Sequence, residues 1–120
     1  MKPELLIDSI TKVVNDYGKN SAGATIDELL RWEDLLSGYN FHMAELEARA
    51  AKEFDYAFYA KRVELIEQDM PISKAEAIAK NETKDWKHLA NRLTLVRVQG
   101  NRVIDAMRQR ISVLKKEKDD

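Results

Sequence analysis

The stretch Asp69-Met70-Pro71-Ile72-Ser73-Lys74-Ala75-Glu76 decides the fold, because it interrupts an otherwise helical sequence near its middle. Pro71 disfavours a helical backbone at Met70, so a helix that arrives from upstream must end there. Ser73 and Glu76 have the spacing of a capping box, in which a hydroxyl and a carboxylate satisfy the first free amides of a helix. The stretch therefore predicts a turn followed at once by a new helix.

The segments on either side of this turn are matched in length. Residues 26–69 and residues 73–116 each span about 44 positions, or ~66 Å of helix at 1.5 Å per residue. Two such helices joined by a short turn must fold back on each other. We therefore expect an all-α protein built on a long antiparallel, coiled-coil-like helical hairpin.

Apolar residues repeat along both segments at helical spacing. The first segment opens with a capping box from Thr25 to Glu28 and carries apolar side chains eleven residues apart, which is typical of a nearly straight helix. The second carries a heptad stripe. The positions are Trp32, Met43, Phe54 and Leu65 in the first segment, and Trp86, Leu89, Leu93, Val96, Gly100, Val103, Met107 and Leu114 in the second.

A shorter helix is predicted ahead of the hairpin. Pro3 suits the first position of a helix, and Gly18 suits its C-terminal cap, so this helix should run from Pro3 to Tyr17. A loop rich in small and polar residues follows up to Ala24. We expect a single domain in which residues 1–24 form the N-terminal helix and loop, and residues 25–120 form the hairpin.

The hairpin carries more apolar surface than two helices can cover. The second long helix is apolar on several faces, and a helix of this kind packs on more than one side. Self-assembly is the simplest remedy, so we expect a homo-oligomer. The predicted oligomer interface consists of Leu93, Val96, Val103, Ile104, Met107 and Ile111.

Composition argues against an enzyme. The chain has no cysteine and only two histidines, and its four glycines form no phosphate-binding loop. Asp85 and His88 share one helical face, but the matching motifs of a bundle metal site are absent. We therefore predict no catalytic residues, no metal site and no cofactor. The absence of cysteine and of a long apolar run favours a cytoplasmic location without a membrane span.

Charge is distributed unevenly along a chain whose net charge is −1. Residues 86–118 carry nine Lys or Arg against two acids, about +7, while residues 1–85 carry eleven against seventeen, about −6. A continuous cationic edge can neutralise successive phosphates of a nucleic acid. The alternative is a solvated face, or a basic helix that complements an acidic one. This cationic edge comprises Lys87, Arg102, Arg108, Lys115 and Lys116.

A second basic patch lies late in the first long helix, where cations bracket aromatic rings. Lys52, Lys61 and Arg62 flank Tyr56 and Tyr59, and Phe54 and Phe58 belong with the core. Rings interleaved with cations are typical of single-strand binding platforms, in which bases stack and phosphates are neutralised. The alternative is that the rings serve the core or an interface, since aromatic residues at helical spacing commonly do.

The layout resembles that of UvsY-type phage recombination mediator proteins. The resemblance rests on Leu46-Glu47-Ala48, on Tyr59-Ala60-Lys61-Arg62-Val63, on the helix start at Ser73 and on the long apolar helix from Trp86 to Leu114. It covers residues 25–116. It implies a non-enzymatic, ring-forming oligomer that binds single-stranded DNA and helps a recombinase to displace a single-strand binding protein.

Two functions are therefore expected from the sequence. The first is a phage-encoded recombination mediator that binds single-stranded DNA in the host cytoplasm. Its DNA contacts would be Lys52, Lys61, Arg62, Tyr56, Tyr59, Arg102, Arg108, Lys115 and Lys116. The second is a coiled-coil structural or interaction protein, such as an assembly adaptor, a chaperone or a modulator of a host factor, without a role in nucleic-acid binding.

Overall fold

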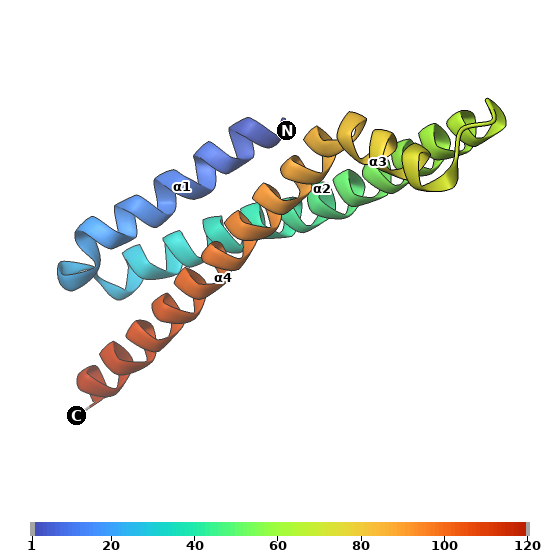
Figure 1. Ribbon diagram of the computed structural model, residues 1–120. Helices are drawn as coiled ribbons and strands as arrows, with labels where there is room; N and C mark the ends of the chain where they lie inside the picture. The colour runs from blue at the N-terminus through green and yellow to red at the C-terminus, as the bar shows by residue number, and fades with distance from the viewer. Residues whose placement is uncertain (1, 120) are drawn as a thin grey trace. The chain divides into compact units, whose positions relative to one another are not determined.

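The computed structural model describes residues 2–119, with Asp119 described by its backbone alone. Met1 and Asp120, which the predicted segments 1–24 and 25–120 include, lie outside the described residues. Every regular element within this range is helical, which confirms the predicted all-α class. The elements are α1 (Pro3–Asn20), a 3-10 turn (Ser21–Gly23), α2 (Ile26–Glu67), α3 (Ile72–Glu82) and α4 (Lys84–Asp119) (Figure 1).

The chain forms two compact units. The terminal unit joins α1 and the part of α2 up to Ala44 to the part of α4 that begins at Leu93. The turn unit is the continuous segment from Glu45 to Arg92 and holds the rest of α2, α3 and the start of α4. Contacts thus group the N-terminal helix with the N-terminal part of α2 and the C-terminal part of α4.

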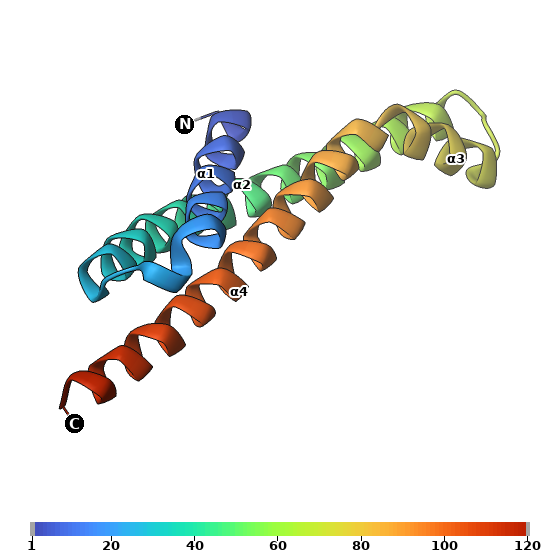
Figure 2. The same cartoon turned by 90° about the vertical axis from the view of Figure 1, so that its left-hand side faces the viewer.

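In the terminal unit α2 and α4 run antiparallel. Glu33 pairs with Arg108, whereas Asn40, two turns later on α2, bonds to Arg97 and Asn101, earlier on α4. The predicted hairpin is confirmed by this order. α1 packs beside α2, with the Tyr17 and Trp32 rings edge to face at 6.4 Å (Figures 1 and 2). The buried side chains include Leu6, Ile10, Leu29, Leu36, Met43, Leu93, Ile104, Met107 and Ile111.

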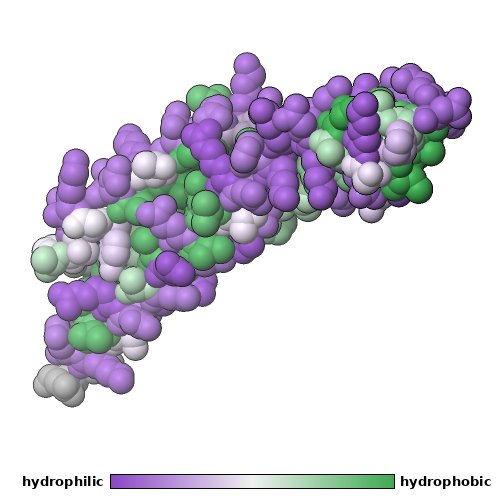
Figure 3. All heavy atoms as spheres, in the orientation of Figure 1, coloured by the Kyte–Doolittle hydropathy of each residue, from purple (hydrophilic) through white to green (hydrophobic). Residues whose placement is uncertain are grey.

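Most residues of the predicted oligomer interface are already buried within the single chain. Four of its six residues, Leu93, Ile104, Met107 and Ile111, are between 0% and 6% exposed within the single chain. Val96 and Val103 are half-buried. The four buried side chains therefore have little surface left for a second copy. Apolar surface that is exposed lies elsewhere, for example on Leu30, Leu35, Phe41, Leu95 and Val113 in this unit, and on Val63 and Ile72 near the turn. Figure 3 shows apolar patches among hydrophilic side chains on one face of the protein.

Of the two capping boxes predicted from the sequence, the one at the start of α2 is present and the one at the start of α3 is not. The Thr25 hydroxyl accepts from the Glu28 amide at 3.2 Å, and Glu28 accepts from the Thr25 amide at 3.4 Å, so the first capping box is confirmed. The capping box predicted at Ser73 is wrong, because α3 already begins at Ile72. There, Pro71 lies in an extended backbone with no side-chain cap. Glu76 pairs with Arg62 instead.

The end of α1 lies later than predicted. The helix continues through Gly18 to Asn20, so Gly18 is an interior residue and not a cap. Asn20 donates its side-chain amide to the Asp16 carbonyl at 2.9 Å. This bond satisfies a carbonyl of the last turn, which a terminal glycine would otherwise have helped to satisfy. The predicted end at Gly18 is wrong because the Asn20 side chain caps the helix two residues later.

The second long helix is not continuous from 73 to 116 as predicted, because it breaks at Thr83. The Thr83 hydroxyl donates to the Ala79 carbonyl at 2.7 Å, inside a buried environment. Threonine that bonds back to the preceding turn bends a helix, and its branched Cβ weakens helix propensity further. The result is two helices, α3 and α4, with Thr83 between them.

The turn at the end of α2 is a Schellman motif closed by an aspartate. Met70 donates its amide to the Leu65 carbonyl at 3.2 Å and Asp69 to Ile66 at 3.0 Å, the two bonds that define the motif. Asp69 has a φ of 64°, in the left-handed region that favours glycine. The predicted turn is confirmed, and the backbone at its centre is strained because Asp69 carries a Cβ at a positive φ.

Asp69→Gly should therefore stabilise the protein. We expect the free energy of unfolding to rise by about 0.5 kcal/mol, because glycine adopts a positive φ without the steric cost that a Cβ brings. Urea denaturation followed by circular dichroism measures the change. Gln68→Gly, one residue earlier and not at positive φ, should lower the stability. Equal losses in both variants would show that the left-handed turn carries no strain.

Candidate nucleic-acid interface

A cavity of about 480 Å³ opens within the turn unit, between α2 and the α3–α4 pair. Its volume lies in the range of about 300–1,000 Å³ that small-molecule and cofactor sites occupy. One side, the aromatic wall, comes from α2 and consists of Phe54, Asp55, Phe58 and Tyr59. The other side, the lysine wall, comes from α3 and α4 and consists of Lys80, Lys84, Lys87, His88 and Asn91.

The aromatic wall is made by helical spacing. Phe54 and Phe58 lie one turn apart on α2, and their rings are stacked at 6.1 Å with an interplanar angle of 24°. Tyr59 meets Phe58 edge to face at 5.5 Å. Phe54 and Phe58 are half-buried, whereas Tyr59 is 59% exposed. The wall thus presents aromatic surface to whatever enters the cavity.

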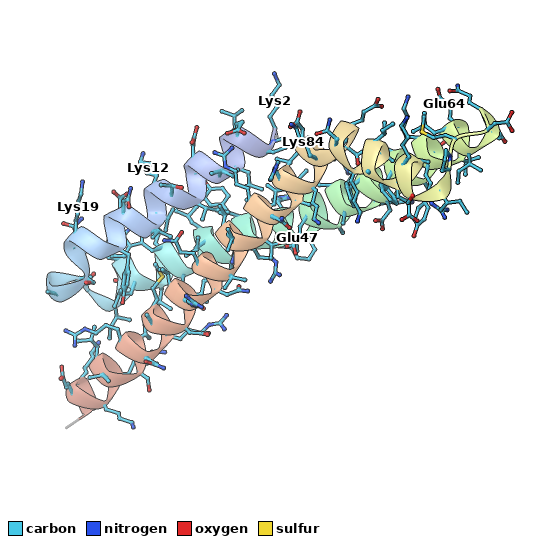
Figure 4. All side chains as sticks on the ribbon, viewed as in Figure 1. Lys2, Lys12, Lys19, Glu47, Glu64 and Lys84 are labelled. Atoms are coloured by element: carbon cyan, nitrogen blue, oxygen red, sulfur yellow. The ribbon has the colours of Figure 1, made fainter. Side chains whose placement is uncertain are left out.

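The lysine wall concentrates positive charge. Lys84, labelled in Figure 4, is the first residue of α4, and residues 84, 87 and 91 recur at the spacing of one face of this helix. Lys80 lines the same cavity from α3. All three lysines are exposed. Within residues 2–119, no ion pair engages any of the three. Their charges are available to an anion.

Two of the predicted DNA contacts, Lys61 and Arg62, form ion pairs within the chain. Lys61 Nζ lies 3.3 Å from Glu82 Oε2 and 3.6 Å from Glu64 Oε1. Its hydrogen bond to Glu82, with a further contribution from Glu64, raises the pKa of Lys61. Arg62 Nε lies 3.2 Å from Glu76 Oε1. Both side chains connect α2 to α3 and do not line the cavity.

The remaining predicted contacts are not gathered in one place. Tyr59 is on the aromatic wall, whereas Lys52 and Tyr56 are exposed on α2 away from the cavity lining. Arg108 is held by Glu33 at 2.8 Å, and this hydrogen bond raises the pKa of its guanidinium. Arg102, Lys115 and Lys116 are exposed on α4, in the terminal unit. The predicted set is therefore divided between the two units.

Sequence reasoning missed most of the lysine wall. Lys87 belongs to the predicted cationic edge and His88 is considered above only as a metal ligand, whereas Lys80 and Lys84 belong to no predicted site. The signal was the spacing of residues 84, 87 and 91 along one face of a helix, and Lys80 lines the same cavity from α3, across the break at Thr83. That spacing could not reveal which residues of α2 lie opposite. The aromatic residues were matched with cations of their own helix, while the structure places cations of α3 and α4 across from them.

The described part of the chain offers little else that points to chemistry. Residues 2–119 contain no group of three or more His, Cys, Asp or Glu side chains placed to hold a metal ion. No helix in that range combines the length and the apolar character that crossing a bilayer requires. Comparisons with protein family models, with curated proteins and with solved structures found no match to this chain.

Proposed function

We propose that this protein is a non-catalytic accessory protein that binds single-stranded DNA through the cavity of the turn unit, in the manner of a recombination mediator. The observation that carries the proposal is the cavity itself, where aromatic rings from α2 face three lysines from α3 and α4. Stacking on rings and neutralisation of phosphates are the two interactions by which proteins hold single strands without reading a duplex.

Charge in the cavity supports this assignment. Its lining holds three lysines and one aspartate, so the site is cationic although the chain as a whole carries a net charge of −1. An approaching strand therefore meets attraction at this site and not over the whole surface. One such site gives modest affinity, and copies of the chain acting together would raise it steeply. The proposed partners are accordingly further copies of the chain, single-stranded DNA, a recombinase and a single-strand binding protein.

Removing Lys84 and Lys87 together should weaken DNA binding and reduce its salt dependence. Each phosphate contact to a single strand contributes about 0.7 to the slope of log affinity against log salt, so Lys84→Ala with Lys87→Ala should lower that slope by about 1.4. Fluorescence polarisation of a labelled oligonucleotide over a series of salt concentrations measures both quantities.

The matched control removes the same charge elsewhere. Lys12 and Lys19 lie on α1 and point to solvent (Figure 4), and Lys12→Ala with Lys19→Ala should leave the slope close to that of the parent protein. Equal losses in both double variants would mean that net charge, and not the cavity, governs binding. No binding of the parent protein at low salt would contradict the proposed function itself.

A second function is favoured by the ion pairs of the chain. Lys61, Arg62 and Arg108 are each held by a glutamate of another helix, as expected if basic residues serve to join helices. Under this alternative the protein is a helical structural or interaction module, and its exposed Phe41, Leu95 and Tyr56 contact other protein surfaces. It predicts assembly in sedimentation experiments together with indifference to DNA at low salt.

A further inference from the structure

The cavity of the turn unit carries one feature that phosphate binding does not explain. Of the described residues that line it, Asp55 is the one acid, and it lies on the aromatic wall and not among the lysines. Asp55 precedes Tyr59 by one helical turn, so the carboxylate and the ring occupy the same face of α2. Within residues 2–119, Asp55 is in no ion pair.

The two walls therefore differ in the chemistry that they offer. The lysine wall attracts a phosphate, whereas the aromatic wall offers ring faces beside a hydrogen-bond acceptor that a phosphate avoids. A nucleotide has the same division, with an anionic phosphate at one end and a flat base at the other. The favourable orientation places the phosphate at Lys80, Lys84 and Lys87, and the base against Phe58 and Tyr59.

We propose that the cavity holds one nucleotide and prefers a base with an exocyclic amino group, with Asp55 as the residue that sets this preference. This inference rests on the proposed function and names the ligand of the same site. The carboxylate accepts a hydrogen bond from the amino group of cytosine or adenine. Thymine has a carbonyl oxygen at the position where cytosine has its amino group, and a carboxylate repels it. Asn91, on the opposite wall, has an amide that donates to a ring nitrogen or carbonyl of the base.

Comparing two pyrimidine homopolymers tests the preference. Oligodeoxycytidylate and oligothymidylate of equal length differ at the position in question while both carry a single pyrimidine ring. We expect the parent protein to bind the cytosine polymer about fivefold more tightly or better, the discrimination that one good hydrogen bond gives. Deoxycytidine monophosphate should also compete with a bound strand more effectively than thymidine monophosphate.

Asp55→Asn is the decisive variant, because an amide both donates and accepts. It should bring the ratio of the two affinities close to one, chiefly by improved binding of the thymine polymer. Asp85→Asn removes the same charge from an exposed position of the turn unit that does not line the cavity, and should keep the parent ratio. Circular dichroism checks that both variants fold.

The outcomes separate this inference from the proposed function. Salt-sensitive binding of both polymers with equal affinity would overturn the base preference and leave single-strand binding in place. If neither mononucleotide competes with a bound strand, the one-nucleotide site is overturned, and single-strand binding again stays in place. A preference for cytosine that persists in Asp55→Asn would remove the role of Asp55. Failure of the parent protein to bind any strand would remove both proposals.

Discussion

Gly100→Ala should lower the free energy of unfolding by about 2 kcal/mol, although alanine is the better helix former by about 1 kcal/mol. Gly100 is buried on α4, and a Cβ there would lie 2.5 Å from Oδ1, 2.7 Å from Nδ2 and 2.9 Å from Cγ of Asn40. Real Cβ atoms do not approach other heavy atoms so closely. Either the α2–α4 packing or the Asn40 side chain must move.

If the Asn40 side chain moved away from the new Cβ, it would lose its hydrogen bonds to α4. Its side chain is 6% exposed, and its Nδ2 donates to the Arg97 carbonyl at 3.0 Å and to Asn101 Oδ1 at 2.9 Å. Each of these bonds contributes about 0.5–1.5 kcal/mol, and overpacking a core adds about 1–3 kcal/mol. These costs exceed the gain in helix propensity. Chemical denaturation of Gly100→Ala should therefore show a lower free energy of unfolding than that of the parent protein.

Two comparisons isolate the cause. Gly38→Ala, on α2, has nothing within 4 Å of its added Cβ and should raise the stability by about 0.5–1 kcal/mol. In an Asn40→Ala background the steric conflict is gone, so Gly100→Ala should become neutral or stabilising, which a double-mutant cycle detects. If Gly100→Ala stabilises the parent protein as Gly38→Ala does, the close packing of Asn40 on Gly100 is refuted.

The Asn40 contact also shows where sequence reasoning reached its limit. Gly100 falls on the predicted heptad stripe, at a position where an apolar side chain is usual. Nothing in the sequence near Gly100 explains a glycine there, because the reason lies sixty residues earlier, at Asn40 on α2. Asn40 Oδ1 is buried with no hydrogen-bond partner among the described residues, at a cost of about 1–3 kcal/mol. A buried asparagine of this kind fixes the register of paired helices.

Some features set by local chemistry were predictable. Others, namely the end of α1 and the break at Thr83, were not, and the register between helices was not either. The Thr25–Glu28 capping box depends on residues three positions apart, and the turn at Asp69 depends on the following proline. The candidate site depends on which face of α2 meets α3 and α4. The cations that flank Tyr59 in the sequence identified it as a candidate, but only the register between helices places Lys80 and Lys84 opposite it. The same register engages Lys61 with Glu82.

Leu93→Ala should lower the free energy of unfolding by about 3 kcal/mol, the typical cost of removing a fully buried leucine. Leu93 is 0% exposed in the single chain, so its side chain already belongs to the core of the terminal unit. The loss should be the same at low and at high protein concentration, because no second copy is needed to bury this residue. Urea denaturation at two concentrations measures it.

Leu95→Ala is the matched control, two residues further along the same helix. Leu95 is 71% exposed, so its replacement should change the stability of the single chain by less than about 0.5 kcal/mol. If copies of the chain assemble through exposed apolar surface, sedimentation of Leu95→Ala should show weaker assembly while Leu93→Ala shows weaker folding. A loss in Leu93→Ala that grows at high protein concentration would instead place Leu93 in an interface between copies. That result would contradict the burial of Leu93 within one chain, because a residue that is covered before assembly gains no further burial from it.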